Sequence, residues 1–184
     1  MTVEADVPAD ALYKTYHMPG RFHPDYYAVD LMSDILSRGQ SSRFYEHLVK
    51  KKEVFNSISS FVMSTIDPGL LVVNGRVKEG VSLGDAENEV DAVLAKLVRE
   101  GILEEELEKV KNQAEATIEF GEVEVINRAM NVAFASLSGD AELVNMENER
   151  IRSVTSEQLQ RIAGEILTEE NSSVLYYRSK SKSK

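Results

Sequence analysis

Short stretches of the chain alternate hydrophobic and polar residues with a period of two, which is the pattern of a half-buried strand. Residues 11–18, ALYKTYHM, show this pattern first, and a Pro-Gly pair follows them as a stop signal. Two further β-rich runs, 56–65 and 69–77, flank an Asp-Pro-Gly turn signal and predict an antiparallel hairpin. The run 172–178, SSVLYYR, predicts one more strand.

Between these runs, apolar residues recur every three or four positions, which predicts amphipathic helices. Gly39 and Gly101 follow two of the apolar stripes as C-terminal stops. Thr155 and Gln158 form a capping-box pattern ahead of the last stripe. The predicted helices cover residues 23–39, 41–52, 82–100, 104–120, 121–137, 142–152 and 159–167.

The order of these elements is strand, two helices, hairpin, several helices and strand. Strands grouped apart from runs of helices are typical of α+β folds, so the sequence predicts an α+β domain with an antiparallel or mixed sheet covered by helices. We expect one domain over residues 1–178 and a disordered low-complexity tail, SKSKSK, over 179–184. The opening MTVEADVPADALYKTYHM resembles a start codon placed ahead of an internal strand, which suggests an excised fragment of a longer protein.

Charge and composition argue against several functions. The formal net charge is −10, and lysine and arginine do not cluster outside the last few residues, which argues against nucleic-acid binding. The tyrosine pairs at 26–27 and 176–177 have no basic groove beside them, so we expect them to pack within the fold. No apolar run approaches the roughly 20 residues of a membrane span, and the absence of cysteine removes thiolate chemistry. The compartment stays open between a bacterial cytoplasm, which is slightly favoured, and a periplasm.

The stretch RFYEH has the spacing of the zinc-peptidase motif H-x-x-E-H, with Arg43 at the first histidine position. Arginine stays protonated and cannot bind a metal ion, so one ligand is missing. Since His17 and His23 lie near the start of the chain, we expect no metal site here and a surface or packing role for His47. An enzyme built on clustered carboxylates is an alternative, but the glutamates at 104–108 are more typical of a helix start.

Three sequence blocks together resemble one known family. They are SSR-x-x-x-x-L at 41–48, G-x-x-x-x-E-L-x-x-x-K at 101–111 and VT-x-E-x-L at 154–159. In this order and spacing they resemble the C-terminal, non-catalytic domain of pitrilysin-type or insulinase-type zinc metallopeptidases. Mitochondrial processing peptidase and the core proteins of the respiratory bc1 complex belong to the same group. The resemblance covers about residues 12–177.

The resemblance implies a fold like the mitochondrial processing peptidase or LuxS-like metallohydrolase domain, and a hydrolase parent that carries out proteolysis. In that family each unit is a clam shell of two similar domains. The zinc ion and H-x-x-E-H belong to the N-terminal domain, so this chain would be the other half, without catalysis or cofactor of its own. It would line the peptide chamber. The implied partners are the catalytic domain, a peptide substrate and a possible homo- or hetero-dimer.

One departure from the family pattern bears on activity. Active members carry an arginine directly after the leucine of the SSR block and a tyrosine seven residues later, a pair implied to contact substrate. Val49 and Asn56 stand at these positions here. Loss of one such donor can cost about 10²- to 10³-fold in rate. The alternative is therefore an inactive structural or interaction subunit that resembles the respiratory-complex core proteins.

Overall fold

Five strands form one mixed sheet in the computed structural model, which describes residues 1–180. The strands are β1 (Thr2–Ala5), β2 (Ala11–Met18), β3 (Phe55–Val62), β4 (Gly69–Val77) and β5 (Ser172–Ser179). Their spatial order is β1-β5-β2-β4-β3. β1 runs parallel to β5, and the remaining neighbours are antiparallel. The predicted α+β class with a mixed sheet is thus confirmed.

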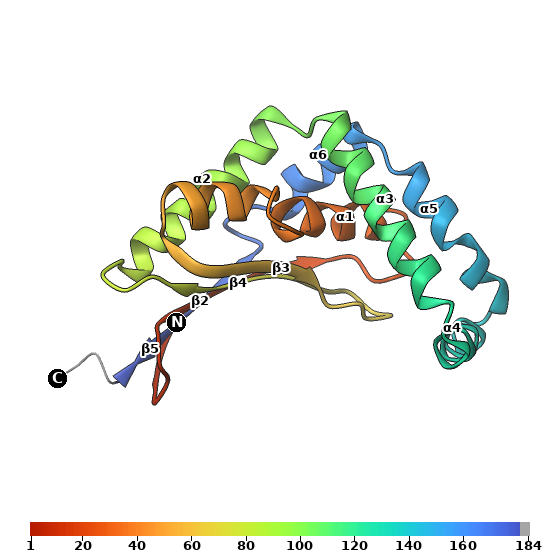
Figure 1. Cartoon of the computed structure of the whole chain (residues 1–184), viewed down its shortest axis with the longest axis horizontal. Helices are drawn as coiled ribbons and strands as arrows, with labels where there is room; N and C mark the ends of the chain where they lie inside the picture. Colours follow the sequence, from red (N-terminus) through yellow and green to blue (C-terminus); the bar gives the residue numbers. More distant parts are fainter. Residues whose placement is uncertain (181–184) are drawn as a thin grey trace.

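Helices cover one face of this sheet (Figure 1). They are α1 (Tyr26–Ser37), the π-helical η1 (Tyr45–Lys51), α2 (Leu83–Glu100), α3 (Glu104–Gly121), α4 (Val125–Leu137), the 3-10 helix η2 (Ala141–Met146), α5 (Glu147–Ser153) and α6 (Ser156–Ile166). No helix within residues 1–180 lies on the opposite face of the sheet. None of these helices is long and apolar enough to span a bilayer.

The core lies where α1 is enclosed by the sheet on one side and by the outer helices on the other. Ala28, Val29 and Leu36 are completely buried, and so is Leu71 on β4. α1 contacts β3, α3, α5 and α6, so it is covered on most of its circumference. This placement explains why the sequence of α1 is apolar on nearly every side, since each buried side chain of this size contributes about 1.5–3 kcal/mol.

Phe55 lies across the sheet above a glycine. A Cβ atom built on Gly75 of β4 would lie 2.6 Å from the Phe55 ring, closer than carbon atoms can approach. The ring itself is almost completely buried. The absence of a side chain at position 75 therefore makes room for the first aromatic residue of the edge strand β3.

Local structure departs from the predictions at four places. The single helix predicted over 142–152 is divided into the 3-10 helix η2 and the short helix α5. β1 was not predicted, because TVEA is short and lacks a clear apolar alternation. The predicted helix near 41–52 is present, but it is wound as a π-helix, a difference in period that one or two turns of sequence do not reveal. β5 continues through Ser179, whose side chain is buried, one residue into the expected tail. Residues 181–184 lie outside the described residues, so the tail stays a prediction.

A buried lysine ties the sheet to α2. Lys14 on β2 points into the helix-covered side, where its Nζ lies 3.1 Å from Oε1 of Glu87 and 2.6 Å from Oδ1 of Asp91. The Lys14 side chain is only 7% exposed. Glu87 also accepts a hydrogen bond from the Tyr176 hydroxyl, which raises the pKa of Tyr176 to about 12. The cluster thus joins β2, β5 and α2.

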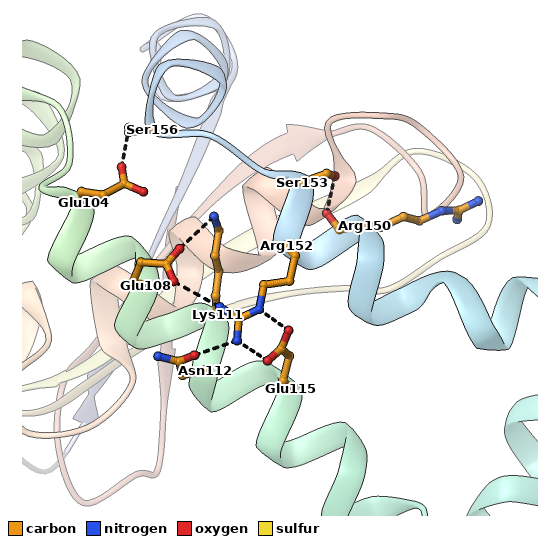
Figure 2. Close-up of polar contacts among 9 residues, drawn as sticks. All are labelled: Glu104, Glu108, Lys111, Asn112, Glu115, Arg150, Arg152, Ser153 and Ser156. Carbon is orange, nitrogen blue, oxygen red and sulfur yellow. Dashed lines mark hydrogen bonds and ion pairs between the residues drawn. The ribbon is translucent and has the colours of Figure 1, made fainter.

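A second polar cluster holds α5 against α3 (Figure 2). The Arg152 guanidinium donates to both oxygens of Glu115, to Oδ1 of Asn112 at 2.7 Å and to Oε2 of Glu108 at 3.1 Å. Lys111, which is nearly buried, donates to the other oxygen of Glu108 at 3.2 Å. Arg152 uses its planar fork on three side chains of one helix, which fixes the rotation of α5 relative to α3.

Replacing Lys14 with methionine should destabilise the domain by about 2–3 kcal/mol, because Glu87 would keep a charge in a mostly buried place without its cation. Asp91 can turn to solvent, which keeps the loss below that of a fully buried pair. The measurement is urea unfolding at pH 7. Lys50→Met is the matched control: it breaks the exposed Lys50–Glu46 pair and should leave stability unchanged. Equal losses in both variants would contradict this account.

Asp30 on α1 makes the stability of the fold depend on pH. Burial raises the pKa of its carboxyl to about 6, and the neighbouring Asp34 adds to the rise, whereas Arg21 and Arg38 oppose it. An unfolded aspartate ionises near 3.9. Between these values the folded protein holds a proton that the unfolded chain has lost, so the free energy of unfolding decreases as the pH rises.

We expect this decrease to reach about 2 kcal/mol between pH 4 and pH 7, since one pKa unit corresponds to about 1.4 kcal/mol and the unfolded carboxyl is already about half ionised at pH 4. Asp30→Asn should remove it, so that the variant equals the parent chain near pH 4 and exceeds it in stability at pH 7. Urea unfolding at four pH values measures the effect. Asp67→Asn, in an exposed turn, is the control. Identical pH profiles for the two variants would exclude Asp30 as the source.

Candidate functional site

The RFYEH stretch has structural partners in place of a metal ion. Arg43 donates to both carboxylate oxygens of Glu106, at 3.1 and 2.7 Å, and to the Gly101 carbonyl at 2.9 Å, so it joins the segment just before η1 to the start of α3. Burial lowers the pKa of His47, and the nearby Lys51 and Arg43 lower it further. Residues 1–180 contain no group of three or more His, Asp or Glu side chains placed to hold a metal ion.

The three histidines lie in separate places. His17 belongs to β2, and its register position is on the helix-free face of the sheet. His23 lies in the loop before α1, where its Nδ1 accepts a hydrogen bond from the backbone N–H of Asp25 at 3.2 Å. His47 lies on η1. The three side chains therefore do not share one site, and the surface or packing role expected for His47 stays a prediction.

The helix-free face of the sheet differs in charge from the rest of the molecule. Successive strand residues point to opposite faces, and Leu12, Tyr16 and Met18 are in the core, so the intervening residues of β2 face outward. The register then places the following residues on the outward face: Ala11, Tyr13, Thr15, His17, Ser57, Ser59, Phe61, Leu70, Val72, Asn74, Arg76, Ser173, Leu175 and Tyr177. None of them is acidic, although the chain carries 31 Asp and Glu residues.

A cavity of about 330 Å³ opens on this face. Its walls come from β2, β3, β4 and β5 and from the loop before β2, and its lining residues include no carboxylate. Tyr13 and Tyr177 supply aromatic surface, and Arg76 supplies the charge. Ser59 donates a hydrogen bond to Oδ1 of Asn74 within the same lining. The cavity offers hydrogen-bond donors and apolar contact side by side, as ligand pockets do.

Val49 and Asn56 have different surroundings. Val49 on η1 is partly buried and packs against the core. Asn56 is exposed on β3, at a β-bulge where the register with β4 shifts between Phe55 and Ser57. The bulge turns two successive residues outward. The substrate-contacting role expected for these two positions stays a prediction.

Sequence reasoning missed the cavity on the open face. Tyr177 was expected to pack, and Arg76 was not singled out, because neither is unusual within its own strand. The signal that could have found them is the lack of acidic residues at alternate positions of all the predicted strands, combined with a correct pairing register.

α4 presents a second unusual surface. Between Val125 and Leu137 it carries one charged residue, Arg128, and only Ala135 is buried. The large exposed apolar side chains are Val125, Ile126, Met130, Val132, Phe134 and Leu137. Figure 1 shows α4 at the end of the molecule away from both termini.

α4 is held in place on its inner side. The Arg21 guanidinium lies 5.8 Å from the Phe134 ring centroid and 5.6 Å from that of Tyr26, and it pairs with Glu147. Arg21 therefore joins α4 to α1 and α5. The other large apolar side chains of α4, such as Ile126, Met130 and Leu137, are exposed. They form an apolar surface of the kind found at protein interfaces.

Structural comparison shows the same fold in several proteases. A protease from Helicobacter pylori superposes with a TM-score of 0.89 at 22% identity, over 97% of this chain and 43% of that chain. The inactive peptidase domain of a proposed zinc protease from Bordetella parapertussis gives a TM-score of 0.86 at 24% identity, with 96% of each chain covered. A chain of Complex III from Candida albicans gives 0.81 at 14% identity, over 96% and 45% of the two chains.

The chain spans 43% of the length of the Helicobacter pylori protease chain. No curated protein sequence matches it. The sequence profile of the peptidase M16 inactive domain matches residues 2–114, well over half of the 184-residue chain. This match confirms the resemblance inferred from the three sequence blocks. With this sequence match and this fold, the chain belongs to the peptidase M16 inactive domain family.

Proposed function

We propose that this chain is the non-catalytic half of a clam-shell zinc metallopeptidase, in which it lines the peptide-binding chamber and contacts the catalytic domain. The observation that carries the proposal is the helix-free face of the sheet. In a chain of net charge −10, the outward positions of β2, β3, β4 and β5 carry no carboxylate. Such a face avoids repelling acidic peptides, as the wall of a peptide chamber requires.

The exposed apolar surface of α4 supports the contact with another domain. Leu137 is 88% exposed, and Met130 and Ile126 are each more than 60% exposed. We take the catalytic domain of the same parent as the occupant, because the chain spans less than half of the Helicobacter pylori protease chain. A covalently joined domain binds at a high effective concentration, so even a modest apolar contact would be occupied.

A second candidate function is that of an inactive structural subunit. Val49 and Asn56 occupy the positions of the arginine and tyrosine that the family resemblance implies for active members. A chain of Complex III also shares the fold. In this reading the clam shell encloses no cleavage reaction, and the same surfaces serve assembly only.

The parent protein separates these candidates. For a working peptidase we expect about one zinc ion per parent chain and cleavage of unfolded peptides, with neither property in this chain alone, because zinc and the general base would come from the catalytic domain. Metal analysis and a fluorogenic peptide assay measure both. A metal-free, inactive parent would exclude the peptidase function and favour the structural subunit.

The α4 contact has its own test. Ile126→Asp combined with Met130→Asp should weaken binding of this chain to the separately produced N-terminal region of the parent by at least about tenfold, because two buried apolar contacts would become charges. The stability of the isolated chain should not change, since both side chains are exposed. Calorimetric titration measures the affinity. Ser136→Asp, on the same helix, is the control for added charge. An unchanged affinity in the double variant would place the contact elsewhere.

A further inference from the structure

Arg76 on β4 is an unneutralised guanidinium. Its side chain makes no ion pair or hydrogen bond with any residue in the range 1–180, and it lines the cavity on the open face of the sheet. Six other arginines pair with carboxylates, namely Arg21, Arg38, Arg43, Arg99, Arg152 and Arg161, whereas Arg128, Arg150 and Arg178 have no carboxylate partner within residues 1–180. Arg76 differs from the other unpaired arginines because it lines a cavity that contains no carboxylate, in a chain with 31 acidic residues against 21 basic ones.

The strand register builds a pocket around this guanidinium. Arg76 lies opposite Ser57 of β3 on one side and Ala11 of β2 on the other. Ala11 in turn lies opposite Tyr177 of β5. Because alanine is small, it leaves a depression between the arginine and the tyrosine, and the loop residues Val7, Pro8 and Ala9 close one end of it.

Hydrogen-bond donors converge on the same space. Oδ1 of Asn74 accepts from the Ser59 hydroxyl, so the Asn74 amide keeps its N–H groups for another acceptor. The hydroxyls of Ser57, Tyr13 and Tyr177 belong to the same lining. No acidic residue lines the cavity, so its formal charge is positive while that of the whole chain is −10.

We propose that this cavity binds the carboxylate of a peptide, either a C-terminal carboxylate or the side chain of an aspartate or glutamate. The planar fork of arginine matches two carboxylate oxygens, and the two tyrosines supply apolar contact for the residue that carries the acid. The size of the cavity suits one or two peptide residues. The identification of the ligand as a peptide rests on the proposed chamber-lining function, whereas the carboxylate preference rests on Arg76 and the acid-free lining.

Three fluorescently labelled pentapeptides of alanine, leucine and serine test the proposal and distinguish the two sources of the carboxylate. The first has a free C-terminus, the second is amidated and contains one glutamate, and the third is amidated and neutral. We expect the first, the second or both to bind the chain at least about tenfold more tightly than the third, with the preference weakening at high salt. Fluorescence anisotropy gives the dissociation constants.

Variants of the chain complete the experiment. Arg76→Met should abolish the preference for the acidic peptides, and Arg76→Lys should keep part of it, because the charge remains but the fork is lost. Arg178→Met is the matched control: this arginine is also exposed on the sheet without a partner among the described residues, but its register position is on the other face. Thermal unfolding followed by circular dichroism checks that each variant is folded.

Equal binding of all three peptides, unchanged by Arg76→Met, would overturn the carboxylate site and leave peptide binding by the open face intact. Binding of none of them would also overturn it. Neither result decides the chamber-lining function, which depends on the zinc content and activity of the parent. If Arg76→Met and Arg178→Met lose the preference for acidic peptides equally, the preference comes from the overall charge of the chain, and a specific site is contradicted.

Discussion

Enclosure of α1 between the sheet and the outer helices is the constraint on which the rest of the structure depends. It requires one face of β2, β3 and β4 to be apolar or internally neutralised, and it leaves the other face of the sheet without a covering layer among residues 1–180. Lys14 is the one charged residue that β2 turns inward, and its two carboxylate partners on α2 compensate for its burial. The outer helices pack buried apolar side chains on this core, and polar contacts at their edges, such as those of Arg152 with α3, add to the attachment. The molecule therefore has a closed core and two surfaces, the helix-free face of the sheet and α4, whose composition suits contacts with other molecules or domains.

The periodicity of the sequence was sufficient for most of this architecture. A long helix such as α2 shows the spacing of its apolar residues over several turns. The Ser82 side chain caps this helix where the apolar pattern begins. The method fails where an element is too short to show a period, as in β1 and η1. It also fails where partners lie far apart in the chain. Nothing near Lys14 in the sequence indicates that Glu87 will neutralise it, so the ion pair of the core could not be predicted.

The candidate site shows the same limit more sharply. Family resemblance directs attention to Val49 and Asn56, because a motif is a property of one local stretch. Arg76 acquires its interest from its neighbours on β3, β2 and β5, which come from both ends of the chain. A cationic side chain in a strand is ordinary by itself. Only the pairing register shows that the lining of its cavity lacks acids, because the register brings together residues that are far apart in the sequence.

The contact between Phe55 and Gly75 has an evolutionary consequence. Since a Cβ at position 75 would overlap the ring, the two positions cannot change independently. A lineage that gains a side chain at position 75 must first replace Phe55 with a smaller residue. An aromatic residue at position 55 can be kept only while position 75 remains glycine. In an alignment of relatives, these two columns should therefore covary, with large residues at one matched by glycine at the other. Such a correlation would mark the β3–β4 register in proteins whose sequences have otherwise diverged.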